Sequence, residues 1–151
     1  MCAGNAKNRR FEEQLGRHAV EVFDDTVALI RQARARGLRV AIVPASKTCR
    51  AILEGAGLLG FFDAAVTGLE AAALGLAGKP APDTFLKAAE SLQGAPREAV
   101  VFEHAIAGVH AGRARGFGLV VGVDRGGASA GLLAVGAHIV CTDLTQLLPT
   151  T

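Results

Sequence analysis

The polar residues best placed for chemistry in this sequence follow apolar runs that are long enough to be strands. Ser46 and Lys47 follow the run Leu38–Val43, and Glu103 and His104 end a later run. In an open parallel sheet, ligands bind outside the carboxyl ends of the strands, where the strand-end loops converge. We therefore expect these four residues to lie at one edge of a sheet.

A fifth candidate, Lys79, lies in the segment Gly78–Asp83, whose two prolines restrict the backbone and oppose a helix before them. Ser46 and Lys47 could donate hydrogen bonds to an anion at the start of a helix. Lys79 would add a fixed positive charge, and Glu103 could bind a metal ion. Residue types and order thus favour a site for an anionic ligand.

Each of these side chains also has a purely structural explanation. Ser46 could cap the following helix, Lys79 could be solvated, and Glu103 could cap the helix expected from residue 105. His104 in its neutral form could bind a softer metal such as Zn²⁺, but one Glu and one His do not complete a catalytic metal shell. The candidates therefore carry weight as a set rather than singly.

The elements that must position these residues alternate along the chain. Strands are expected at 38–43, 64–67, 99–103, 118–123 and 138–141, and helices at 48–56, 83–92, 105–115 and 129–135. A further helix follows Asp24 and Asp25, one of which should cap it, and ends at Gly37. This alternation predicts βαβ units, a parallel sheet and a three-layer, Rossmann-like α/β fold.

We expect one core domain over residues 18–151, in which 18–23 alternates briefly, while residues 1–17 are either poorly ordered or the remnant of a cap. Residues 1–50 carry ten Lys and Arg against five Asp and Glu, but no interleaved aromatics for base stacking, so nucleic acid is not the expected partner. The sequence lacks a signal segment, a membrane-spanning run and a disulfide or zinc pattern among its three cysteines. These features predict a cytoplasmic protein without a membrane partner.

Five segments together resemble one family: GKPAPDTF, VVFEHAIAGVHAGRARGF, VVGVDRGG, GAHIV and TDL. They resemble the haloacid dehalogenase-like phosphohydrolases, and most of all the branch of β-phosphoglucomutase and related sugar-phosphate phosphatases. The resemblance covers roughly residues 19–148. It implies Mg²⁺-dependent phosphoryl transfer from a phosphorylated sugar through an aspartyl-phosphate, in which positioning of charge does most of the catalysis.

The family's functional residues match this sequence in part. Lys79 matches the lysine that neutralises the phosphoryl charge, Glu103 matches the first acid of the metal pair, and Ser46 with Lys47 matches the phosphate- or sugar-contacting pair of the mutase branch. Pro44 stands where the family has a hydroxyl, and His104 stands where it has the second metal-binding acid. The family's Asp-x-Asp-Gly nucleophile strand is not found.

In the family that nucleophile strand lies between the second and fourth strands. Without it, we expect two half-sheets, residues 38–67 and 99–141, with unpaired inner edges and exposed apolar faces, which favour association. The halves could close directly, residues 18–23 could substitute, or another polypeptide could donate a strand, and a homo-oligomer is a further expectation. Three functions fit: a degenerate member that is inactive alone but still binds phosphate, an enzyme completed by a separate nucleophile-bearing segment, and a non-catalytic interaction module.

Overall fold

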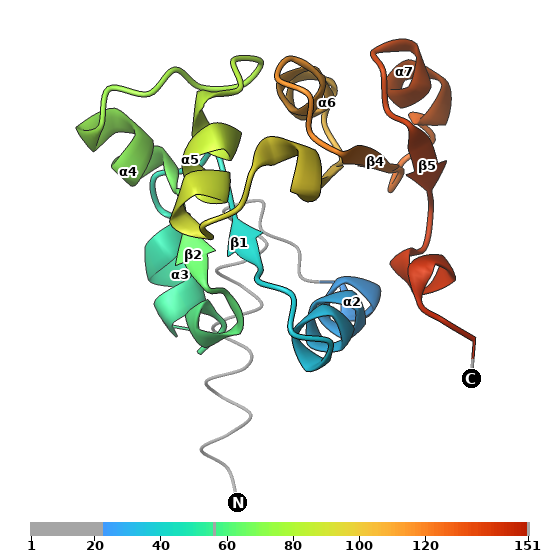
Figure 1. Ribbon diagram of the computed structural model, residues 1–151, viewed down its shortest axis with the longest axis horizontal. Helices are drawn as coiled ribbons and strands as arrows, with labels where there is room; N and C mark the ends of the chain where they lie inside the picture. Colours follow the sequence, from blue (N-terminus) through green and yellow to red (C-terminus); the bar gives the residue numbers. More distant parts are fainter. Residues whose placement is uncertain (1–22, 56, 151) are drawn as a thin grey trace, which may run out of the picture.

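Five short parallel strands carry the fold, and they form two separate sheets (Figure 1). The structure is a computed structural model that describes residues 23–55 and 57–150. In the first sheet β1 (Ala41–Ile42) pairs with β2 (Ala64–Ala65). The second sheet has the order β3 (Val100–Glu103), β4 (Leu119–Val123), β5 (Ile139–Cys141). All pairings are parallel, as the sequence predicts.

Helices alternate with the strands: α2 (Asp24–Ala35), α3 (Cys49–Gly55), α4 (Gly68–Ala73), α5 (Asp83–Ser91), α6 (Ile106–Arg113) and α7 (Ser129–Ala134). Three 3-10 turns complete the set: η1 (Leu59–Phe61), η2 (Pro96–Glu98) and η3 (Leu144–Leu147). Among the helices described, none combines the length and the apolar character needed to cross a membrane. The strands and helices expected between residues 23 and 150 occur in the predicted order, and α4 is an additional helix. The expectations for residues 1–17 and for 18–22 lie outside the described residues.

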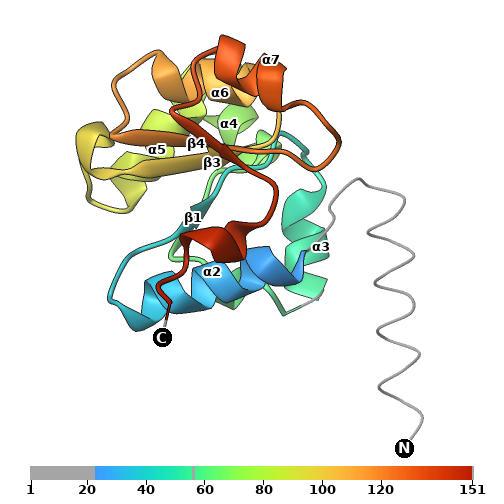
Figure 2. The ribbon, with the colours of Figure 1, turned by 90° about the vertical axis from the view of Figure 1, so that its right-hand side faces the viewer.

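Helices cover the larger sheet on both faces, so the domain has three layers (Figure 2). On one face α5, α6 and α7 contribute Phe85, Val109 and Leu132 to a core that includes Val101 and Val120. On the other face, α2 and η3 cover a second, smaller core with the side chains Leu29, Val121, Val123, Cys141 and Leu144. This arrangement is the three-layer α/β fold expected from the sequence.

The gap between the two sheets is the main departure from a continuous sheet. β1 and β3 are not hydrogen-bonded to each other in the part of the chain that the structure describes. Val100 and Phe102 on β3 are 49% and 41% exposed, although they belong to an apolar strand. The expectation of two half-sheets with open inner edges is therefore confirmed, and direct closure of the two halves is excluded for these residues. The 38–43 strand is also shorter than expected, because β2 offers β1 only two paired residues.

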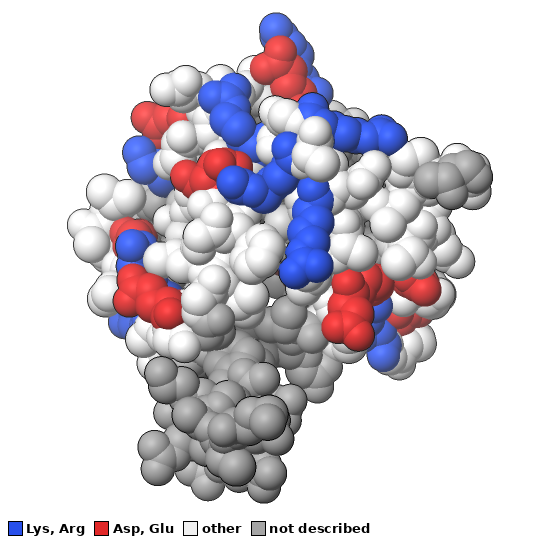
Figure 3. All heavy atoms as spheres, turned by 90° about the horizontal axis from the view of Figure 1, so that it is seen from below, with Lys and Arg blue, Asp and Glu red and all other residues white. Residues whose placement is uncertain are grey.

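Basic side chains of α2 and the following turn make contacts within the chain. Arg34 pairs with Asp63 at 3.1 Å, and the Arg31 guanidinium lies 5.7 Å from the centre of the Phe61 ring. Seen from below, basic and acidic residues are mixed on the surface rather than separated (Figure 3). Part of the basic excess of the first fifty residues thus has a structural explanation: these arginines are solvated or ion-paired side chains of one helix.

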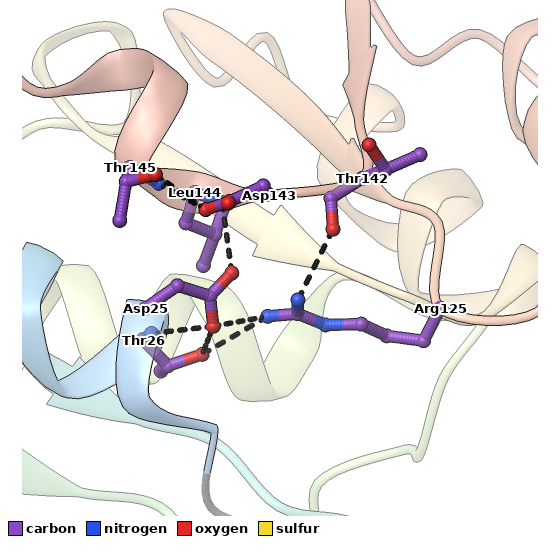
Figure 4. A network of polar contacts seen from close by, with 7 residues as sticks. All are labelled: Asp25, Thr26, Arg125, Thr142, Asp143, Leu144 and Thr145. Carbon is purple, nitrogen blue, oxygen red and sulfur yellow. Dashed lines mark hydrogen bonds and ion pairs between the residues drawn. The ribbon is translucent and has the colours of Figure 1, made fainter.

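Asp25 joins α2 to the far side of the larger sheet (Figure 4). Its Oδ1 accepts a hydrogen bond from Arg125 Nη2 at 2.7 Å, and its Oδ2 accepts one from the Leu144 backbone N–H at 2.8 Å. Arg125 also lies over the Phe23 ring, 4.1 Å from its centre. The predicted role of Asp24 or Asp25 as helix cap is wrong, because the helix begins at Asp24 and no side chain caps it.

The hydrogen bond from Arg125 lowers the pKa of Asp25 from 3.8 to about 2. A carboxylate with a lowered folded-state pKa stabilises the fold above its unfolded pKa, and this contribution is lost as the pH falls through the folded pKa. Asp25→Asn should therefore lower the free energy of unfolding by about 2 kcal/mol at neutral pH. Urea unfolding should show this difference shrinking as the pH falls from 3.8 towards 2.

Asp24→Asn is the matched control, because Asp24 lies on the same helical turn but is exposed. Its loss removes only a favourable charge near the helix N-terminus, an effect of about 0.5 kcal/mol. Equal destabilisation by the two substitutions at every pH would show that Asp25 acts through general helix electrostatics and not through Arg125.

Candidate functional site

Lys79 and Glu103 form an ion pair between the two sheets. Lys79 Nζ lies 2.7 Å from Glu103 Oε2 and donates a second hydrogen bond, 3.1 Å long, to the carbonyl oxygen of Val43. The ammonium also lies 4.8 Å from the centre of the Phe85 ring. Only 7% of the Glu103 side chain and 17% of the Lys79 side chain are exposed. The expectation that Lys79 is simply solvated is therefore wrong, and one lysine connects the ends of β1 and β3.

Glu103 is held in place by the turn before α6. Its Oε1 accepts hydrogen bonds from the backbone N–H groups of His104 at 2.9 Å and Ala105 at 3.0 Å. These amides lie in the turn before α6, which begins at Ile106, and no side chain caps this helix, so the expected role of Glu103 as a helix cap is wrong. Gly108, one turn into α6, makes room for the carboxylate, since a Cβ there would lie 2.0 Å from Glu103 Cγ. The helix and the acid are therefore fitted to each other.

A cavity of about 220 Å³ adjoins this ion pair. Lys47 and Lys79 line it, together with the hydroxyl-bearing residues Thr67 and Thr84. Both threonine Oγ1 atoms are buried and lack a hydrogen-bond partner among the described residues. A buried hydroxyl without a partner is unfavourable, and both belong to residues that line the cavity. The cavity is thus bordered by two lysines and by two threonines whose hydroxyls are shielded from solvent.

Of the residues in the loop between β1 and α3, some line the cavity and Ser46 does not. Lys47 reaches the cavity wall, as do Pro44 and Ala45. Ser46 is not part of that wall, and its Oγ lies 2.9 Å from Thr48 Oγ1 and accepts the Thr48 N–H at 3.2 Å. The structure therefore brings Lys47 and Lys79 to one cavity and leaves Ser46 in a local turn that prepares the start of α3.

Thr67 and Thr84 are the site residues that sequence reasoning missed. Thr67 lies two residues after the end of β2, so the rule that singled out polar residues at the ends of the other strands would have found it. Thr84 had no such signal, because it lies in the first turn of α5, where a threonine is unremarkable in sequence. Only the structure shows that Thr84 lines the cavity and that its hydroxyl is buried.

The described residues do not fit Mg²⁺. Mg²⁺ takes about six oxygen ligands, usually including one or two carboxylates. Both oxygens of Glu103 already accept hydrogen bonds, from Lys79 and from two backbone N–H groups, and the next residue, His104, is 77% exposed. No group of three or more His, Cys, Asp or Glu able to hold a metal ion occurs in residues 23–55 and 57–150. The magnesium site that the family resemblance implies is thus not formed by these residues.

Asp124 follows β4, and both of its carboxylate oxygens also accept hydrogen bonds. Its Oδ1 accepts the backbone N–H groups of Gly126, Gly127 and Ala128, and its Oδ2 accepts the N–H and hydroxyl of Ser129. The Ser129 hydroxyl and these amides hold the pKa of Asp124 well below its usual range. Asp124 therefore shapes the turn between β4 and α7 and has no oxygen left for a ligand.

Comparison with known proteins places this geometry in a family. A sequence profile of the haloacid dehalogenase-like hydrolases matches residues 3–116. The β-phosphoglucomutase of Mycobacterium tuberculosis is 42% identical over 148 residues, which are 96% of this chain and 56% of that protein. The chain therefore spans little more than half the length of this relative.

Solved structures agree with the sequence matches. A haloacid dehalogenase phosphatase of Thermococcus onnurineus is 29% identical with a TM-score of 0.72, covering 91% of this chain and 62% of that one. A family hydrolase of Deinococcus radiodurans, solved with bound phosphate and sodium, has the same identity and TM-score and covers 83% and 56%. The resemblance expected from the motifs is confirmed: this chain belongs to the haloacid dehalogenase-like hydrolases and is related to β-phosphoglucomutase.

Proposed function

We propose that this chain provides the phosphate-binding part of a sugar-phosphate phosphatase or phosphoglucomutase, and that its 151 residues alone bind a phosphate monoester without turning it over. One observation carries the proposal: Lys47 and Lys79 line the same cavity, beside two buried hydroxyls that lack partners. Two ammonium groups and two hydroxyls suit the charge and hydrogen-bonding needs of a phosphate group.

We expect no turnover because these 151 residues lack the nucleophile motif of the family. Nucleophilic phosphoryl transfer in this family needs an aspartate at the site, and the 151 residues contain no Asp-x-Asp pair. Pro44, at the end of β1, brings neither a hydroxyl nor an N–H to the cavity. Lys79 keeps the charge that would neutralise a phosphate, so binding survives where chemistry does not. A cytoplasmic location, with Cys49 and Cys141 as buried thiols, belongs to the same proposal.

Calorimetry with glucose 6-phosphate, with and without Mg²⁺, tests the binding, and release of nitrophenol from p-nitrophenyl phosphate tests turnover. We expect saturable binding of glucose 6-phosphate that Mg²⁺ does not tighten. We expect no release of nitrophenol, with or without Mg²⁺. Lys47→Ala should weaken binding roughly tenfold, because one charge-assisted hydrogen bond is worth more than 1 kcal/mol.

Lys87→Ala is the matched control, because Lys87 pairs with Glu90 on α5 and does not line the cavity. It should bind glucose 6-phosphate as the unaltered chain does. Equal binding by Lys47→Ala and the unaltered chain would place the ligand elsewhere, and Mg²⁺-dependent release of nitrophenol would contradict the lack of turnover.

A further inference from the structure

The wall of the cavity beside Lys79 is mostly apolar. Two glycines, Gly68 and Gly78, add no side chain to it. Six further residues, from the end of β1 and from α4 with the loop that follows it, have purely hydrocarbon side chains: Val43, Pro44, Ala45, Ala71, Ala72 and Leu76. Most of the wall therefore offers contact to apolar groups rather than hydrogen bonds from side chains.

The polar side chains of the wall are few, and their charges have one sign. Lys47 and Lys79 are the charged residues, and Thr67 and Thr84 carry hydroxyls that are shielded from solvent. Asp, Glu, Asn, Gln, His and Arg do not occur among the described residues that line the cavity. These are side chains that could pair with the several hydroxyl groups of a sugar. The cavity therefore has little with which to recognise a polyhydroxylated ligand.

The charges at the cavity suit a ligand with one anionic group. Lys79 Nζ lies 2.7 Å from Glu103 Oε2, so much of its positive charge is offset by that carboxylate. Lys47 is exposed, and none of the ion pairs among the described residues includes it. A second anionic group on the same ligand would meet no further cation of the wall. The charges thus favour a monoester over a bisphosphate.

The volume of the cavity limits the ligand to a small molecule. The cavity measures about 220 Å³, which is less than the roughly 300 Å³ at which sites for drug-sized ligands begin. The buried residues Thr67 and Ala71 line it together with the exposed residues Ala45 and Ala72, so it runs inward from the surface. A phosphate group with a chain of a few carbons suits a cavity of this size and lining.

From this wall we infer that the cavity binds phosphate monoesters of short, apolar alcohols, with the phosphate at Lys47 and Lys79 and the carbon chain against Ala71 and Leu76. The inference rests on the proposed phosphate binding and adds the class of ester to it. A sugar phosphate then binds through its phosphate alone, with its hydroxyl groups in water outside the cavity. Recognition of the sugar is left to residues other than those that line this cavity.

Propyl phosphate and glycerol 3-phosphate are a matched pair of ligands, because they share a three-carbon chain and differ by two hydroxyl groups. Calorimetry with the full chain should give a dissociation constant at least tenfold lower for propyl phosphate, since hydroxyls lose their water against an apolar wall. Methyl phosphate should bind roughly tenfold more weakly than propyl phosphate, because two methylenes fewer are buried. Glucose 6-phosphate should bind about as tightly as methyl phosphate.

Two leucines that follow α4 form a matched pair of positions in the protein. Leu76 lines the cavity, whereas Leu74 is 56% exposed and does not line it. Leu76→Gln should raise the dissociation constant of propyl phosphate roughly fivefold and leave that of inorganic phosphate unchanged, because it removes apolar contact but no charge. Leu74→Gln should leave both constants unchanged. The pair of ligands tests the inference without any substitution, so a variant that unfolds does not remove the test.

Two results would overturn the inference while phosphate binding stands. One is binding of glycerol 3-phosphate that equals or exceeds that of propyl phosphate, and the other is equal loss of propyl phosphate binding in the two leucine variants. If neither inorganic phosphate nor methyl phosphate bound, the proposed phosphate site itself would be wrong, and the inference would fall with it. The two failures are therefore distinguishable.

Discussion

Replacing Gly108 by alanine should destabilise the protein strongly, although alanine is the better helix former. The new Cβ would lie 2.0 Å from Glu103 Cγ and 2.1 Å from its Cδ and Oε2, closer than atoms can approach. Either α6 moves or the carboxylate leaves Lys79, and a displaced, unpaired buried charge is costly. We expect a loss of about 3 kcal/mol in the free energy of unfolding, measured by urea titration.

Two controls separate this clash from a general effect of the methyl group. Gly55→Ala, at the end of α3, meets nothing within 4 Å, so it should be neutral or stabilise by less than about 1 kcal/mol. In the background Glu103→Ala the clashing atoms are absent, so adding Gly108→Ala should cost little. A full penalty in that background would show that Gly108 serves the backbone of α6 and not the acid.

Replacing Lys79 by methionine should also lower the free energy of unfolding strongly. It keeps most of the side-chain volume but leaves the Glu103 carboxylate, 7% exposed, without its cation. Removing one partner of a buried ion pair costs about 3–5 kcal/mol, whereas replacing both partners is often nearly neutral. Lys79→Met alone should therefore lower the free energy of unfolding by several times as much as Lys79→Met combined with Glu103→Gln.

An exposed ion pair on α5 is the control for this cycle. Lys87 lies 2.9 Å from Glu90, whose side chain is largely exposed, so Lys87→Met should change stability by less than about 0.5 kcal/mol. If the two methionine variants were equally stable, the Lys79–Glu103 pair would be no more than a solvent-screened contact. Phosphate binding should be lost in Lys79→Met and retained in Lys87→Met, because Lys79 lines the cavity and Lys87 does not.

The ion pair also explains the conflict between family resemblance and metal chemistry at the same strand end. The residue after Glu103 is a histidine, and the partner of the Glu103 carboxylate is Lys79. The same contact joins the ends of the two half-sheets, so a residue expected to serve catalysis also holds the fold together. Loss of phosphate binding by Lys79→Met must therefore be measured on folded protein.

Much of the fold was predictable because its determinants are local. Apolar runs bounded by glycine or polar residues located every strand that the structure describes between residues 23 and 150. The Asp25 prediction failed for a physical reason. Asp25 lies inside the helix rather than before it, and besides the Thr26 N–H its carboxylate binds Arg125 and the Leu144 N–H, which come from the other end of the chain.

The sequence by itself determined the family, the order of elements, the split of the sheet and the candidates Lys47, Lys79 and Glu103. These follow from motif spacing and hydrophobic pattern, which are properties of neighbouring residues. Only the tertiary structure decided that Lys79 pairs with Glu103, that Ser46 stays outside the cavity and that two threonine hydroxyls are buried without partners. Ion pairing and burial depend on which groups from distant segments meet, and no local pattern encodes those distances.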